Sequence, residues 1–232
     1  MSIRLLRYDD ALDTIWDDLV YTEARLSADK RAKDLAKAVS ALVARVEKVS
    51  LEQRAKWRAE TNAEAVVDKC DDDLDDQVSA FSNDLSHAEG GKKNTARYKL
   101  YFGSSATDVI RLGLKSELEK IGGWVSKLKK EKLAALGGHA KAFTALASAG
   151  KAALAARTEA QSARASHRIE TIHTLVDDVN AARISIAAEL DTRAVKLRLP
   201  HDFSSRFFRH STRAPKPQPQ PVQAPPPAPP PS

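Results

Sequence analysis

The stretch that decides the fold is HAKAFTALASAGKAALAARTEAQSARASHRIETIHTLVDDVNAARISIAAELDTRAVKLR, from His139 to Arg198. Its first half is dominated by alanine, the residue that loses least entropy on entering a helix. Its second half carries apolar residues at helical spacing: Ile169, Ile172, Val176, Val179, Ile186 and Leu190. This spacing predicts one apolar stripe along a long helix, interrupted by Arg183. We expect Ile172 and Val176 on this stripe to face Val78 and Phe81.

The distribution of helix breakers predicts long helices elsewhere in the chain as well. All nine glycines lie between Gly90 and Gly150, and all eleven prolines lie at Pro200 or later. The residues before Gly90 therefore contain neither breaker, and they carry apolar residues at helical spacing. The run that precedes the glycines is Val67, Cys70, Leu74, Val78, Phe81 and Leu85. Cys70 keeps the phase of this stripe, which is typical of a small buried residue.

These stripes predict an all-α fold, an elongated antiparallel bundle or coiled coil of long amphipathic helices. The expected helices span residues 9–49, 51–88, 105–136 and 139–198, with the clearest break at 86–105. Ser50 is either a turn or kink or part of a helix that runs straight through it. Gly122-Gly123 and Gly137-Gly138 each indicate a turn or a kink, and Gly137-Gly138 is the better candidate for a turn. The alternative is a single long helical hairpin, a rod whose arms at 9–88 and 105–197 fold back near residue 96. Both layouts leave apolar surface uncovered, so we expect a homo-oligomer.

Composition limits the partners and the cellular compartments that are expected for the protein. The formal net charge of +6 allows an anionic surface or a nucleic acid as a partner. Cys70 is the single cysteine, so no intramolecular disulfide can form. Met1–Tyr8 is followed by acidic residues where a signal peptide needs an apolar run, and no window reaches the length of a membrane span. We therefore expect a cytoplasmic protein without a transmembrane span.

Three regions differ in composition: a helical bundle or rod at 1–199, a basic Phe-rich segment at 200–213, and a disordered Pro-rich tail at 214–232. The Phe-rich segment either folds back on the bundle as a short amphipathic turn or stays exposed as an anchor. The tail is either a ligand for a proline-binding groove or a solvated spacer. The candidate partner-binding residues are Phe203, Arg206, Phe207, Phe208, Arg209, Pro226 and Pro229.

Two acidic patterns deserve comparison with known metal sites. The run Asp71–Asp76 lacks the glycine and the terminal glutamate of a calcium loop, so it predicts a solvated acidic face. Glu170-Thr171-Ile172-His173 has the spacing of a di-iron ligand pair, with a partial echo at Asp84–His87. Such a centre needs further glutamates from two other helices, and only aspartates such as Asp17 and Asp108 are expected near the right level. We therefore predict that Glu170 and His173 bind no metal.

The residues after the main break form a compact aromatic cluster, Tyr98, Leu100, Tyr101 and Phe102. This cluster is either a plug for the end of the bundle or a platform on which nucleic-acid bases stack beside nearby lysines. The preceding Gly90-Gly91-Lys92-Lys93 lacks the spacing of a phosphate-binding loop.

No nucleophile elbow, zinc-spaced Cys/His set or dinucleotide fingerprint occurs in the sequence, so we expect no enzyme activity and no cofactor. The function predicted first is a non-enzymatic helical scaffold or adaptor that self-associates and recruits a protein partner through its basic and Pro-rich C-terminus. The alternatives are a binder of anionic surfaces, such as membrane, polymer granule or nucleic acid, and a di-metal four-helix-bundle oxidase.

Overall fold

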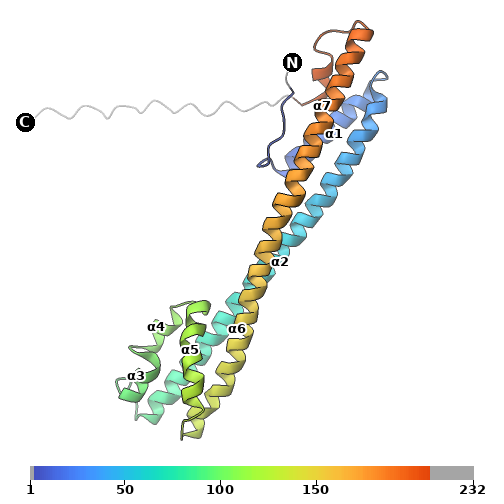
Figure 1. Ribbon diagram of the computed structural model, residues 1–232. Helices are drawn as coiled ribbons and strands as arrows, with labels where there is room; N and C mark the ends of the chain where they lie inside the picture. The colour runs from blue at the N-terminus through green and yellow to red at the C-terminus, as the bar shows by residue number, and fades with distance from the viewer. Residues whose placement is uncertain (1–2, 210–232) are drawn as a thin grey trace, which may run out of the picture. The chain divides into compact units, whose positions relative to one another are not determined.

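The computed structural model describes residues 3–209, and the regular elements in that range are all helical (Figure 1). This confirms the predicted all-α class. The chain divides into two compact units. Unit 1 comprises the residues up to Ala44 together with those from Val176 onward, and unit 2 comprises Arg45–Leu175. The predicted disordered tail at 214–232 lies outside the described residues.

In chain order the elements are α1 (Leu12–Ala28), the 3-10 helix η1 (Lys33–Leu35), α2 (Ala36–Ala88), α3 (Ala96–Phe102), α4 (Ala106–Ile110), α5 (Leu114–Leu128), α6 (Ala134–Ser166), the π-helical segment η2 (His167–Ile172), α7 (His173–Lys196) and the 3-10 helix η3 (Ser204–Phe207). The expected long helices are present, since α2 has 53 residues and α6 has 33. The break at 86–105 is confirmed as well, because α2 ends at Ala88 and Gly90 and Gly91 follow with φ of 67° and 84°.

The first expected helix, 9–49, is divided at a place that the sequence did not indicate. Helix α1 ends at Ala28, and Asp29 starts a turn in which its carboxylate accepts the Arg31 backbone N–H at 2.9 Å. An aspartate that bonds the backbone two residues on can replace glycine or proline as a turn former. Ser50 lies inside α2, so a turn there is wrong and the alternative of a helix that runs through Ser50 is confirmed.

Both glycine pairs lie inside helices, so the turn expected at Gly137-Gly138 is wrong, and Gly122-Gly123 is not a turn either. Gly122-Gly123 belongs to α5 and Gly137-Gly138 to α6, and the turn between the two helices falls at 129–133. The chain also breaks before α5, where Gly113 has a φ of 72°. The alternative of one uninterrupted arm at 105–197 is therefore wrong.

The core of unit 2 is built around Phe81 of α2. Its ring centroid lies 5.0 Å from that of Tyr101, 5.7 Å from that of Trp124 and 5.7 Å from that of Phe143. The side chains therefore come from α2, α3, α5 and α6, four helices that lie together in Figure 1. Tyr98, Tyr101 and Phe102 are buried in the same cluster. The aromatic residues of α3 thus act as a plug, and their buried rings are not a stacking platform.

Two polar contacts show that α2 and α6 run antiparallel within unit 2, as the fold prediction expected (Figure 1). His139 Nε2 at the start of α6 lies 2.9 Å from Asp84 Oδ2, and Arg164 near the end of α6 lies 2.6 Å from Glu60 Oε2. Phe81 therefore faces the start of α6. Ile172 is buried as predicted, but this register places it beyond Glu60, so the expected pairing of Ile172 with Phe81 is wrong.

Unit 1 packs α1, η1, the first turns of α2, α7 and η3 around apolar residues such as Ile15, Leu19 and Leu190. The chain before α1 is fixed to α7 by a reciprocal pair of hydrogen bonds. The Leu6 N–H donates to Asn180 Oδ1 at 2.8 Å, and Asn180 Nδ2 donates to the Leu6 carbonyl at 2.9 Å. Within residues 3–209, no helix combines the length and the apolar character needed to cross a membrane.

Candidate functional site

The described part of the predicted Phe-rich segment folds back onto unit 1. Phe203, Phe207 and Phe208 are all buried, and η3 packs against α1. Arg31 lies over the Phe203 ring at 4.8 Å. This matches the expected amphipathic turn rather than an exposed anchor. As partner contacts, the three phenylalanines remain a prediction that requires the segment to detach.

The two arginines in the described part of the segment are exposed. Arg206 is bound to Asp202 through two hydrogen bonds to Oδ2 and one to Oδ1, and Arg209 lies 3.6 Å from Asp17 Oδ2. Pro226 and Pro229 lie outside the described residues.

A cleft opens beside η3, lined by Arg25, Ala28, Asp29, Lys30, Arg31, Phe203, Arg206 and Phe207. Four of these residues are basic and one is acidic. Asp29 is bound to Arg31, with Oδ2 at 2.6 Å, and this contact holds the pKa of Asp29 down at about 2. The excess of positive charge beside two aromatic rings suits an acidic ligand with an apolar group.

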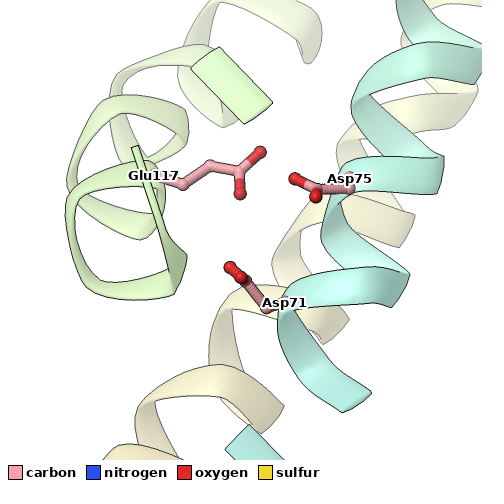
Figure 2. Close-up of side chains that lie close together, drawn as sticks. All are labelled: Asp71, Asp75 and Glu117. Atoms are coloured by element: carbon pink, nitrogen blue, oxygen red, sulfur yellow. The ribbon is translucent and has the colours of Figure 1, made fainter. Parts of the chain in front are cut away.

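Three carboxylates from distant parts of the sequence meet inside unit 2 (Figure 2). Asp71 and Asp75 are four residues apart on α2, so one turn of helix places them on the same face. Glu117 extends from α5 toward both of them. One ligand oxygen from each residue lies within 4.8 Å of the others. We call Asp71, Asp75 and Glu117 the carboxylate cluster.

This cluster corrects the interpretation of the acidic run as a solvated face. Asp72 and Asp76 are exposed, but Asp71 and Asp75 are only partly exposed and Glu117 is completely buried. Glu117 lies three residues after Leu114 and four before Ile121, both buried on the same face of α5. That phase is the signal in the sequence that a charged residue belongs to the core stripe.

The electrostatics of the cluster are unfavourable to three ionised groups. Burial, then the charge and close approach of the Asp75 carboxylate, then the charge of Asp71, raise the pKa of Glu117 to about 8. Burial is also the largest cause that raises the pKa of Asp75 and of Asp71. Both carboxylate oxygens of Glu117 and one oxygen of each aspartate are buried without a hydrogen bond of normal geometry. The cluster can take up a proton or a cation, and either would relieve this repulsion.

The two pairs that resemble di-iron ligands in sequence, Glu170–His173 and Asp84–His87, do not lie close together. Glu170 is exposed on η2, whereas Asp84 contacts His139 at the other end of the α2–α6 pairing. Because Glu60 pairs with Arg164, Glu170 lies beyond Glu60, which is 24 residues and roughly 36 Å of helix from Asp84. The structure therefore offers no four-helix ligand set around Glu170 and His173 within the described range.

A second basic cleft lies in unit 2, lined by Arg97, Leu100, Tyr101, Lys127, Lys130, Glu131, Lys132 and Leu133. Glu131 is bound there by Arg97 and by the Tyr101 hydroxyl, which donates at 2.9 Å. The three lysines of the cleft come from the end of α5 and the turn that follows it.

Comparison with known proteins identifies no relative, since no protein-family model, no curated protein and no solved structure matches this chain.

Proposed function

We propose that the protein is a non-enzymatic, cytoplasmic helical scaffold that self-associates and recruits a protein partner through its basic C-terminal part. The observation that carries this proposal is a pair of helical segments within unit 2 that contain no fully buried residue. On α2 no residue from Ser50 to Val66 is buried, and on the opposite helix no residue from Leu154 to Thr171 is buried. We call these two stretches the uncovered segment.

Helical segments without buried residues need packing contacts from another molecule to be stable. A segment of roughly five turns is marginal as an isolated helix, because helices in proteins are stabilised mainly by packing of an apolar face. The ion pair of Glu60 with Arg164 crosses the uncovered segment, but exposed pairs contribute only about 0–1 kcal/mol. Leu51 is 65% exposed, Trp57 59% and Ile169 62%. A second copy of the chain is the occupant that would bury these side chains.

Self-association is tested by analytical ultracentrifugation of the full chain over a range of concentrations. We expect a dimer or larger species whose population falls in Leu51→Lys and Trp57→Lys. The matched control is Leu100→Lys, because Leu100 is 52% exposed but lies on α3. A monomer at every concentration, or an oligomer unaffected by Leu51→Lys and Trp57→Lys together, would count against the scaffold.

Recruitment of a partner is supported by the cleft beside η3. Its basic lining fits an acidic peptide, and it includes the exposed residues Lys30 and Arg206. A fluorescent peptide of alternating glutamate and phenylalanine is a suitable probe. We expect Lys30→Glu with Arg206→Glu to weaken its binding at least about tenfold, as charge reversal in a small site does. Lys37→Glu, outside the cleft, is the control. The predicted role of Pro226 and Pro229 is tested separately by removing the tail after Arg213.

The alternative of an anionic-surface binder is supported by the second basic cleft, with Lys127, Lys130 and Lys132 close together. Co-sedimentation with vesicles containing phosphatidylserine, and with duplex DNA, is the test. Binding through these lysines should fall steeply with salt and with their replacement by glutamine. Binding that persists at high salt would exclude this mode.

A further inference from the structure

We propose that the carboxylate cluster, Asp71, Asp75 and Glu117, binds a hard divalent cation between α2 and α5. This site goes beyond the scaffold function and is independent of self-association, since all three residues lie within unit 2. It also differs from the Glu170–His173 pattern considered from the sequence.

The first argument is the state of Glu117. Its exposed fraction is 0%, its carboxylate extends toward Asp71 and Asp75, and neither of its oxygens has a hydrogen-bond donor (Figure 2). Buried carboxylates in folded proteins are normally paired with a cation or accept hydrogen bonds, because an unpaired buried charge is very costly. The buried Glu117 therefore indicates that a positive species belongs next to it.

Within residues 3–209, no side chain is found to supply that positive charge. The groups that shift the pKa of Glu117 are Asp75 and Asp71, and those that act on Asp71 and Asp75 include the further carboxylates of Asp68, Asp72 and Asp76. Among the residues that the structure describes, no lysine or arginine contributes to these shifts. Several carboxylates and no base make a local field that attracts a multivalent cation from solution.

The geometry suits one ion. Two oxygens on opposite sides of Ca²⁺ are about 4.6–5.2 Å apart, twice the usual Ca–O distance, and those around Mg²⁺ are about 4.0–4.2 Å apart. The three ligand oxygens here lie within 4.8 Å of one another. All are carboxylate oxygens. Such ligands suit the hard ions Ca²⁺, Mg²⁺ and Mn²⁺ better than they suit softer metals. Asp71 and Asp75 are only partly buried, so water can complete the coordination from the outer side.

Binding would fasten α5 to α2. Glu117 belongs to α5 and the two aspartates to α2, so one ion would replace repulsion between the helices by a shared ligand. Because the unfolded chain cannot assemble the site, the ion should stabilise the folded protein.

The test uses the full chain, purified with a chelator and then dialysed free of it. We expect at least one of Ca²⁺, Mg²⁺ and Mn²⁺ to raise the melting temperature by several degrees in a saturable way, and calorimetry to show one ion per chain. Glu117→Gln keeps the side-chain shape but removes the charge. It should weaken binding at least about 100-fold, more than the loss of an outer-shell partner does. Asp75→Asn should act in the same direction, and Asp72→Asn, exposed on the same turn of α2 and not a ligand, should weaken binding far less than either.

Glu117→Gln should fold, and without added ions it should melt above the parent, because it removes a repelling buried carboxylate. A cation effect that survives Glu117→Gln, or no effect of any of the three ions at millimolar concentration, overturns the proposal. A higher melting temperature of Glu117→Gln together with no ion binding to the parent would show that the cluster holds only a proton, and would overturn it as well.

Discussion

Leu118 of α5 packs directly against the backbone of Gly150 of α6. A Cβ atom built on Gly150 would lie 3.0 Å from Leu118 Cδ1 and 3.2 Å from Leu114 Cδ1. The missing side chain therefore lets α5 approach α6 at this level. Glu117 is the neighbour of Leu118 on α5, so the same close approach helps to hold the carboxylate cluster in place.

A side chain at Gly150 should separate the two helices. We expect Gly150→Val to lower the free energy of unfolding by about 1–3 kcal/mol, the usual cost of overpacking a filled core. Gly138 is the matched control, since it lies in the same helix and nothing would lie within 4 Å of its added Cβ. Gly138→Ala should stabilise the protein by about 0.5–1 kcal/mol through helix propensity alone. Urea denaturation measures both, and equal effects at the two positions would contradict the close approach.

Phe81→Ala should be among the most destabilising single truncations in unit 2. The ring is fully buried and is surrounded by Tyr101, Trp124 and Phe143, so its removal leaves a large cavity. We expect a loss of about 3–5 kcal/mol in the free energy of unfolding. Leu100→Ala on the exposed side of α3 should change it by no more than about 0.5 kcal/mol. A small effect of Phe81→Ala would mean that the aromatic cluster is not the core.

The raised pKa of Glu117 predicts the direction of a pH effect on stability. Its pKa is about 8 in the folded chain against the ordinary 4.5, so the folded state holds one more proton in that interval. Stability should therefore fall as pH rises from about 5 to 8, by at most about 1.4 kcal/mol per pH unit. Chemical denaturation in chelator measures this slope in the parent and in Glu117→Gln. The difference between their slopes isolates Glu117, and it should vanish if Glu117 has an ordinary pKa.

Asp18 and Arg183 form a buried pair in unit 1, with Asp18 Oδ2 3.7 Å from Arg183 Nη1. Arg183 is 1% exposed and also lies over the Phe208 ring at 5.3 Å. Removing only the acid leaves a buried cation, so Asp18→Ala should cost about 3 kcal/mol or more. The double variant Asp18→Leu with Arg183→Met should recover most of that loss, because two apolar side chains replace the pair. Thermal melts of both variants test this expectation. A double variant as unstable as Asp18→Ala would contradict this account.

The long helices could be predicted because their signals are local. Alanine content, apolar spacing and the confinement of glycine and proline gave the all-α class and the break after Ala88. The errors arose where packing decides. Gly122-Gly123 and Gly137-Gly138 stay helical although glycine costs about 1 kcal/mol, since their helices are held by tertiary contacts. The turn at Asp29 uses a side-chain bond to the backbone, which leaves little trace in the hydrophobic pattern.

The candidate sites were less accessible to sequence reasoning. Arg183 interrupts the apolar stripe in the sequence, but it lies four residues after Val179 and is buried in the same phase. Glu117 is likewise a charged residue at a core position, and hydrophobic spacing alone does not identify such a residue. Asp71 and Asp75 lie more than 40 residues before Glu117 in the sequence. Only the packing of α5 against α2 brings the three carboxylates together.

The uncovered segment has a consequence for the exchange of backbone amide hydrogens with solvent. Protection from exchange in a helix depends on the cost of opening it locally, and opening Ser50–Val66 exposes no buried side chain. These amides should exchange with deuterium much faster than those around Phe81 on the same helix. If a second copy covers the segment, the exchange rate becomes a function of protein concentration. Mass-spectrometric measurement at two concentrations would then report, residue by residue, where one chain lies against another.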